Sequence, residues 1–187
     1  NYLNLLSSQF LDKKKLYTGI LKMIQGNYAD ARNLFLDTND VKKYYYLIHI
    51  HLFENKMDEA EKTLNKWLTE NLSNIPQEGF EFFLIFNHLK TDKKLLNGYV
   101  SFMKEYIAHN LEKAETLISK LRNSPLYSYL VILLTKLYEN SGNWIKIELI
   151  LKNVIKENNF FGEKALFLLG KLYIKKILVF FLITIGV

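Results

Sequence analysis

The sequence predicts an all-helical fold built from a series of antiparallel hairpins. Apolar residues recur with helical periodicity along almost the whole chain, and no stretch alternates apolar and polar residues for long enough to indicate a strand. Short segments rich in Gly, Asn and Asp separate the periodic segments, as expected for turns between antiparallel helices. Of the 187 residues, 49% are hydrophobic and only two are proline, a composition typical of a folded helical protein.

Breaks in the periodicity define the expected helices and loops. The clearest loop covers residues 74–79, because Pro76 cannot continue a helix and Gly79 weakens one. The connections are short, so each helix is expected to run antiparallel to the next. In chain order the expected helices cover approximately residues 1–11, 13–24, 28–37, 41–54, 58–71, 80–89, 92–108, 111–122, 126–140 and 143–157, with a last helix from about 162.

A repeated pattern recurs in these hairpins. Each copy has an apolar first helix, a tight turn with Gly or Asn, a small residue early in the second helix and a large apolar residue four places later. The small residue allows the second helix to approach the first closely, and the large residue fills the space beside it. The small positions hold Ala31, Ala60, Ala114 and, as an exception, Ile147, and the large positions hold Phe35, Leu64, Ile118 and Leu151.

Glycines and capping residues accompany the repeated pattern. Gly19 and Gly170 permit close contact between neighbouring helices. A fifth copy begins with Leu169, Gly170 and Tyr173 but lacks a second helix of the expected amphipathic kind. Each hairpin buries little surface alone, so the hairpins are expected to stabilise one another by stacking. The residues expected to cap the second helices are Asn27, Asp58, Asn110 and Asn143.

The repeated pattern resembles the tetratricopeptide repeat, in which Leu-Gly and an aromatic residue precede a Gly-containing turn, and Ala is followed by Phe or Tyr. Degenerate copies cover residues 1–176, with an irregular region around 72–92 that contains an extra helix. The resemblance implies a right-handed superhelix, or solenoid, of antiparallel helical hairpins. The first copy carries the resemblance most clearly, with Gly19, Gly26, Ala31 and Phe35.

The same resemblance implies a non-catalytic scaffold that binds other proteins. In tetratricopeptide repeats the first helices line a concave groove that accepts an extended peptide or a helix. Tyrosine and lysine at such positions favour an acidic or aromatic-bearing peptide. The competing interpretation is that several of these tyrosines pack between hairpins. The candidate partner-binding residues are Lys42, Tyr45, His49, Tyr99, Met103, Tyr106, Tyr129, Lys136, Lys164 and Lys171.

An RNA-binding helical-repeat protein is the alternative hypothesis. Each repeat of such an array contacts one base, so basic and polar residues should recur at one place in every repeat. The net charge of +6 is mild and the chain has only two arginines, whereas a nucleic-acid surface concentrates its positive charge. Nucleic acid is therefore the less favoured partner. The aligned first-helix positions are mixed, with Ile20, His49, Met103, Lys136 and Lys171.

No pattern in the sequence indicates catalysis, a metal site or a cofactor. The absence of cysteine excludes a thiol nucleophile and a cysteine-ligated zinc site. His49 and His51 are two residues apart on one helix, so their side chains point to different sides and do not share a metal ion. Glycine-rich phosphate loops and zinc-protease helices are missing as well. We therefore expect a protein that is not an enzyme and holds neither metal nor cofactor.

An apolar run ends the sequence. Residues 177–187 carry no charge and directly follow Lys175 and Lys176. One interpretation is the start of a transmembrane helix, although these eleven residues fall short of the ~20 that span a bilayer. The lysine pair would then keep the repeat domain on the cytoplasmic side, attached to the membrane at its C-terminal end. The other interpretation is a buried closing helix, or a helix that docks onto a partner or a second copy of the chain.

Overall fold

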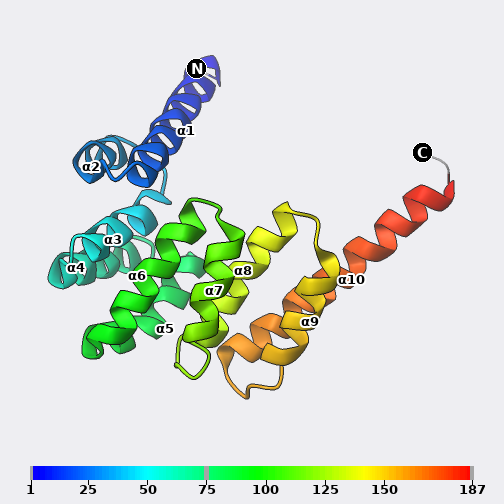
Figure 1. Ribbon diagram of the computed structural model, residues 1–187. Helices are drawn as coiled ribbons and strands as arrows, with labels where there is room; N and C mark the ends of the chain where they lie inside the picture. The colour runs from blue at the N-terminus through cyan, green and yellow to red at the C-terminus, as the bar shows by residue number, and fades with distance from the viewer. Residues whose placement is uncertain (1, 74–75, 186–187) are drawn as a thin grey trace. The chain divides into compact units, whose positions relative to one another are not determined.

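The computed structural model contains only α-helices among the residues it describes, so the all-helical prediction is confirmed (Figure 1). The described residues are 2–73 and 76–185, with side chains described for 8–73, 76–178 and 181. The helices are α1 (Tyr2–Ile24), α2 (Tyr28–Leu36), α3 (Lys43–Phe53), α4 (Met57–Glu70), α5 (Gln77–Thr91), α6 (Lys93–Ile107), α7 (Leu111–Lys120), α8 (Tyr127–Asn140), α9 (Trp144–Val154) and α10 (Phe160–Ile185).

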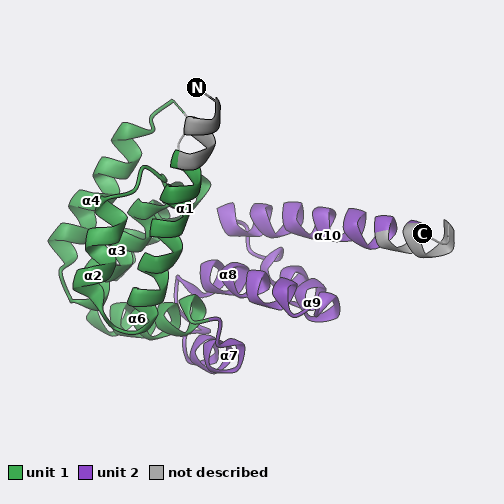
Figure 2. Cartoon of the chain, turned by 90° about the horizontal axis from the view of Figure 1, so that it is seen from above, with its two compact units in different colours: residues 1–108 green, residues 109–187 purple. Residues whose placement is uncertain are grey.

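The chain forms two compact units (Figure 2). Residues 1–108 hold α1 to α6, and residues 109–187 hold α7 to α10. In the first unit consecutive helices pack against one another, and α3 also contacts α6. In the second unit α8 packs against α7 and α9, while α10 packs against both α8 and α9. Each unit therefore has its own buried apolar core.

The N-terminal helix is longer than expected. The sequence suggested separate helical stretches before and after Asp12, but α1 continues without a break from Tyr2 to Ile24. The Asp12 side chain accepts hydrogen bonds from the connection between α2 and α3. Because it bonds to that distant segment, it does not cap a new helix within α1.

The expected loop at residues 74–79 is shorter than predicted, because α5 already begins at Gln77. Residues 74–75 lie outside the described residues. Gly79 lies in the first turn of α5 and is buried. A Cβ atom added there would lie 3.3 Å from the indole ring of Trp67, so the glycine makes room for the largest side chain of α4.

The turns that precede α2, α4, α7 and α9 share one backbone geometry. In the turns before α2, α4 and α9, the backbone amide of the residue that follows the positive-φ residue donates a hydrogen bond to the carbonyl oxygen five residues earlier. In the turn before α4, for example, Lys56 N lies 2.8 Å from His51 O. This hydrogen bond closes the preceding helix in the manner of a Schellman motif. The same kind of turn thus precedes four helices of the chain. The residues with positive φ are Gly26 (80°), Asn55 (59°), His109 (56°) and Gly142 (69°).

Two of the four predicted helix caps are confirmed. The side chains of Asn110 and Asn143 accept hydrogen bonds from backbone amides three residues later, at 3.4 Å and 3.2 Å. Asn27 occupies the N-cap of α2, but its side chain forms no capping hydrogen bond. Lys56, rather than Asp58, is the N-cap of α4. Asp58 lies in the first turn, where its negative charge suits the helix dipole.

Small residues lie where the hairpin helices approach each other. Ala31 on α2 and Ala60 on α4 are fully buried where these helices pack on α1 and α3. Ala114 on α7 is fully buried as well. Gly19 on α1 faces Phe35 on α2 so closely that a Cβ atom added to the glycine would lie 2.5 Å from the ring. At Gly170 on α10, by contrast, no described atom lies within 4 Å of an added Cβ atom.

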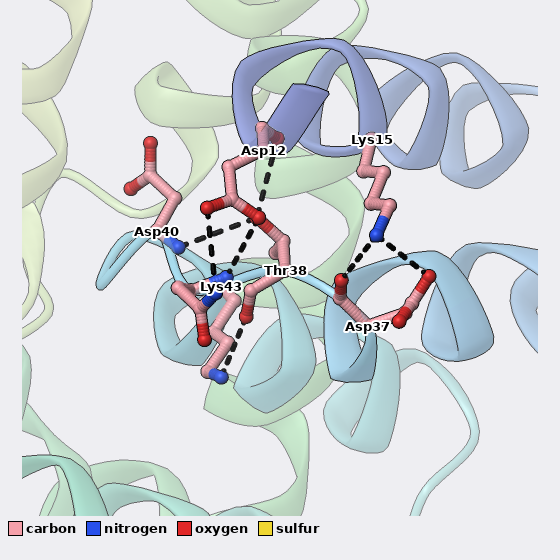
Figure 3. Close-up of polar contacts among 7 residues, drawn as sticks. Asp12, Lys15, Asp37, Thr38, Asp40 and Lys43 are labelled. Carbon is pink, nitrogen blue, oxygen red and sulfur yellow. Dashed lines mark hydrogen bonds and ion pairs between the residues drawn. The ribbon is translucent and has the colours of Figure 1, made fainter. Parts of the chain in front are cut away.

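A polar cluster joins α1 to the connection between α2 and α3 (Figure 3). The Asp12 carboxylate accepts from the backbone amide of Asn39 at 3.1 Å and from the hydroxyl of Thr38 at 3.2 Å. Lys15 Nζ lies 2.9 Å from both the backbone oxygen and the carboxylate of Asp37. The hydrogen bond from the Asn39 amide holds the pKa of Asp12 below its ordinary value. These bonds fix the path of the chain between the first two hairpins.

Replacing Gly19 by Ala should destabilise the first unit, because the added carbon would meet the Phe35 ring at 2.5 Å. Overpacking of this kind costs about 1–3 kcal/mol. Gly170→Ala is the matched control, since its added carbon meets no described atom and alanine favours a helix over glycine by about 0.5–1 kcal/mol. Urea denaturation followed by circular dichroism measures both effects. Similar effects of the two substitutions would contradict the packing at Gly19.

Replacing Asp12 by Ala should lower the urea midpoint at neutral pH. A carboxyl group whose pKa is lowered by folding stabilises the protein above its unfolded-state pKa, here 3.8, and this contribution is lost as the pH falls through the folded-state pKa. The difference in urea midpoint between the variant and the parent protein should therefore be largest at pH 7 and should vanish in strong acid. Lys13→Ala, an exposed neighbour on α1, serves as control. A difference that does not depend on pH would argue against the hydrogen-bonded carboxylate.

Candidate protein-interaction surface

The candidate partner-binding residues divide into a buried group and an accessible group. A residue inside the core cannot touch a partner, so the prediction is wrong for the buried group. Its members are His49, Tyr99, Met103 and Tyr129, none of which is more than 1% exposed. The exposed or half-buried members are Lys42, Tyr45 and Tyr106 in the first unit, and Lys136, Lys164 and Lys171 in the second.

The extra helix α5 explains the burial in the first unit. His49 Nδ1 lies 2.6 Å from the backbone oxygen of Tyr45, and His49 Nε2 lies 2.8 Å from the Tyr99 hydroxyl. Because a carbonyl only accepts, Nδ1 carries the proton and the tyrosine hydroxyl donates to Nε2. Burial lowers the pKa of His49 to about 4, so the ring is neutral at pH 7. Phe82 of α5 packs against both rings, with centroids 5.5 Å from His49 and 6.0 Å from Tyr99.

The remaining tyrosines also take part in packing. Tyr129 on α8 lies beside Phe161 at the start of α10, with ring centroids 5.7 Å apart. Tyr106 stacks on Phe102 at 5.8 Å, and burial raises the pKa of Tyr106 above its ordinary range. Tyr45 contacts the His49 ring at 4.4 Å. The interpretation of these tyrosines as packing residues therefore accounts for most of their contacts.

A cleft of about 330 Å³ lies between α8, α9 and α10 in the second unit. A smaller hollow of about 130 Å³ adjoins it and shares Trp144, Leu172 and Lys175. The buried residues that line the larger cleft are Thr135, Ile147, Leu151 and Leu172. The exposed or half-buried lining residues are Glu139, Trp144, Leu168, Lys171 and Lys175.

Two lysines of α10 bring positive charge to this cleft. Lys175 Nζ lies 3.1 Å from a Glu139 carboxylate oxygen and 4.5 Å from the centroid of the Trp144 ring. Lys171 Nζ lies 4.5 Å from the centroid of the Phe167 ring and forms no ion pair with any residue that the structure describes. A contact between a cation and an aromatic face stabilises an exposed ammonium group by about 0.5–1 kcal/mol. The Lys171 charge is thus available to an acidic group of a ligand.

Glu148 on α9 fastens α10 beside the cleft. Its carboxylate accepts from Lys176 Nζ at 2.6 Å and from the Tyr173 hydroxyl at 2.8 Å, both on α10. It also accepts from Lys152 Nζ on its own helix at 2.7 Å. The hydrogen bonds from Lys152, Lys176 and Tyr173 lower the pKa of Glu148 to about 2. The carboxylate therefore stays charged at neutral pH and holds the lysine-bearing side of α10 in position.

The helix α10 is apolar on two faces. One face packs against α8 and α9, and the other, which we name the Gly170 face, is uncovered by the described part of the chain. A helix that is apolar all round is usually buried all round. The packed face contains Phe161, Ala165, Leu169 and Leu172, all buried. The Gly170 face consists of Gly170 and the exposed residues Leu166, Phe167, Tyr173, Ile174 and Ile177.

Residues 177–185 of the apolar run continue α10 instead of forming a separate element. The predicted boundary after Lys176 falls inside α10, which continues to Ile185. Ile177, Leu178 and Phe181 are each more than half exposed, so these side chains do not fit a buried closing helix. The other side chains of this run, 179–180 and 182–187, lie outside the described residues. In the part of the chain that the structure covers, no helix combines the length and apolar character needed to cross a membrane.

Sequence reasoning missed Trp144 because it considered only the first helices of the hairpins, and it chose Lys164 and Lys171 on α10 without Lys175. Trp144 begins α9, a second helix, and a tryptophan directly after the Gly142-Asn143 turn was the available signal. Among the described residues, no three His, Asp or Glu side chains are grouped to hold a metal ion. The second unit offers apolar contact, aromatic rings and lysine charge. Comparison of the chain with models of known protein families, with curated proteins and with solved structures finds no match.

Replacing Glu148 by Gln should loosen α10 from α9, because the amide keeps the shape of the carboxylate but loses its charge. Amide hydrogen exchange near Tyr173 and Lys176 should become faster at neutral pH, as expected for a helix held by fewer contacts. Glu112→Gln on α7 is the matched control, because Glu112 is exposed and its carboxylate has no partner among the described side chains. If amide hydrogen exchange in α10 is unchanged, the packed apolar face alone holds this helix against α8 and α9.

Proposed function

We propose that this chain is a non-catalytic scaffold that binds other proteins, folded as a tetratricopeptide-like right-handed superhelix of antiparallel hairpins. The recurrent positive-φ turn and the buried small residues support the fold proposal. The observation that carries the functional proposal is the cleft of the second unit. It combines an apolar floor with an exposed lysine, Lys171, that no described carboxylate neutralises.

The chemistry of the cleft suits a segment of protein with one large apolar side chain next to an acidic one. A volume of about 330 Å³ is at the small end of ligand sites, so the cleft accommodates an anchoring side chain rather than a whole peptide. The Trp144 ring and Leu172 offer contact area to that anchor. Lys171 offers its charge to a neighbouring carboxylate. An extended acidic peptide fits this combination.

RNA remains the alternative ligand, and the charges at the cleft favour it less. Of the three lysines that follow Gly170 on α10, Lys175 is paired with Glu139 and Lys176 with Glu148. Paired lysines contribute little to the release of counterions that drives binding to a phosphate backbone. Lys171 alone would give a weak, barely salt-dependent interaction with nucleic acid.

A library of short peptides displayed on phage, selected against the full chain, should enrich sequences with an aromatic residue or leucine beside an acidic residue. Fluorescence anisotropy of a labelled, selected peptide should then show at least tenfold weaker binding to Trp144→Ala, since truncating a central aromatic anchor costs about 2 kcal/mol or more. Ile145→Ala removes the next side chain, which is 81% exposed, and is the matched control. Lys171→Glu should weaken binding as well, with less effect at high salt.

Two outcomes would contradict the proposal. The first is a selection that enriches no common pattern, or peptides that bind Trp144→Ala and Ile145→Ala equally well. The second is tight, strongly salt-dependent binding of a mixed-sequence single-stranded RNA, measured in the same way, which would favour the RNA-binding alternative.

A further inference from the structure

Lys175 makes two contacts of different kinds at the cleft. Its Nζ atom lies 3.1 Å from a carboxylate oxygen of Glu139 on α8 and 4.5 Å from the centroid of the Trp144 ring on α9. All three residues line the cleft, and Trp144 and Lys175 also line the smaller hollow beside it. The contact with the ring does not depend on Glu139, so it keeps the ammonium group at the cleft when another carboxylate replaces Glu139.

The ion pair between Glu139 and Lys175 is open to exchange. Both side chains are about half exposed, 51% for Glu139 and 54% for Lys175. Ion pairs at such positions contribute little to stability, because water competes for both partners. Lys176, by contrast, pairs with Glu148, which is 22% exposed and accepts hydrogen bonds from two further side chains. Lys175 can therefore change its partner without loosening α10.

Lys171 marks the place where an acidic group of a ligand would lie. It precedes Lys175 by four residues on α10, so the two side chains are neighbours on one side of the helix, and both line the cleft. Lys171 rests on the Phe167 ring at 4.5 Å and has no carboxylate partner among the described residues. A carboxylate placed between the two lysines can contact both ammonium groups, whereas Glu139 pairs with Lys175 alone.

Glu139 and an acidic group of the ligand compete for the same ammonium group. Two carboxylates repel each other, so both cannot lie close to Lys175 without a penalty. Binding of an acidic group therefore replaces one ion pair by another at Lys175 and adds a new one only at Lys171. The chain thus gains less from charge on binding than its two lysines could supply.

We propose that the acidic group of the ligand binds between Lys171 and Lys175, and that Glu139 occupies part of this site in the free protein. Glu139 is a built-in competitor that lowers the affinity of the cleft for acidic peptides. The ligand displaces Glu139 because its carboxylate contacts two ammonium groups and that of Glu139 contacts one. This inference rests on the proposed scaffold function and assigns to it both the place of the acidic group and a residue that regulates affinity.

The test uses the full chain and a labelled peptide selected for the cleft, amidated at its C-terminus so that its side chains carry its only carboxylates. Fluorescence anisotropy should show about fivefold tighter binding to Glu139→Gln than to the parent chain, near the upper end of what an exposed ion pair contributes. Glu112→Gln makes the same change of net charge at an exposed residue of α7 without a partner among the described side chains, and should leave binding unchanged.

Two further measurements separate exchange at Lys175 from a general effect of charge. Binding to Glu139→Gln forms one more ion pair than binding to the parent chain, so its affinity should fall more steeply between about 50 and 500 mM NaCl. Lys175→Met removes the ammonium group and keeps an apolar stem. In this background Glu139→Gln should no longer tighten binding, because no shared ammonium group is left to release.

Three results would overturn the proposal. Equal affinities of Glu139→Gln and Glu112→Gln would show that Glu139 does not compete with the ligand. Weaker binding to Glu139→Gln would show that Glu139 positions Lys175 for the ligand instead of competing for it. A gain in affinity that persists in the Lys175→Met background would show that Glu139 repels the ligand directly, without exchange at Lys175.

Failure of this proposal is distinguishable from failure of the proposed function. The proposed function requires selected peptides whose binding depends on Trp144, and Glu139 has no part in that requirement. If such peptides bind and Glu139→Gln does not tighten their binding, the scaffold function stands and only the competition by Glu139 falls. If the selection yields no peptide that depends on Trp144, both proposals fall together.

Discussion

The packing of this chain depends on how closely the second helix of a hairpin can approach the first. Ala31 on α2 and Ala60 on α4 are both fully buried, and their small size lets these helices lie close to α1 and α3. In the hairpin of α8 and α9 the same position holds Ile147, a larger residue that is also buried. Ile147 also lines the cleft, together with Thr135 of α8. The candidate binding site thus includes the position of the repeated pattern at which isoleucine replaces alanine.

The all-helical character and most helix boundaries were predictable because periodicity, turns and caps are local properties of a sequence. The burial of the expected groove residues was not, because it depends on contacts between distant segments. His49 and Tyr99 are 50 residues apart and share a hydrogen bond. Phe82 of α5 covers both rings, and no spacing in the sequence relates it to either. The sequence marked the region of α5 as irregular but did not show which face the extra helix covers.

The hydrogen bond between His49 and Tyr99 also explains why polar residues at groove positions are misleading. A buried histidine is tolerated only when both ring nitrogens are satisfied, which here requires the Tyr45 carbonyl and the Tyr99 hydroxyl. Tyrosine and histidine on neighbouring first helices therefore satisfy each other in the core as readily as they contact a partner. Lysine is different, because its charge resists burial, and the three lysines among the predicted residues that lie on α8 and α10 are all at least partly accessible.

The exposed face of α10 is already ordered by contacts on the other side of the helix. Phe161, Ala165 and Leu172 bury the packed face, and Glu148 receives hydrogen bonds from Tyr173 and Lys176. Tyr173 belongs to the Gly170 face, so the bond to Glu148 limits its rotation before any partner arrives. Ordering of interface side chains costs about 0.5–1.5 kcal/mol each when it occurs on binding. That cost is therefore reduced for a ligand that contacts Tyr173.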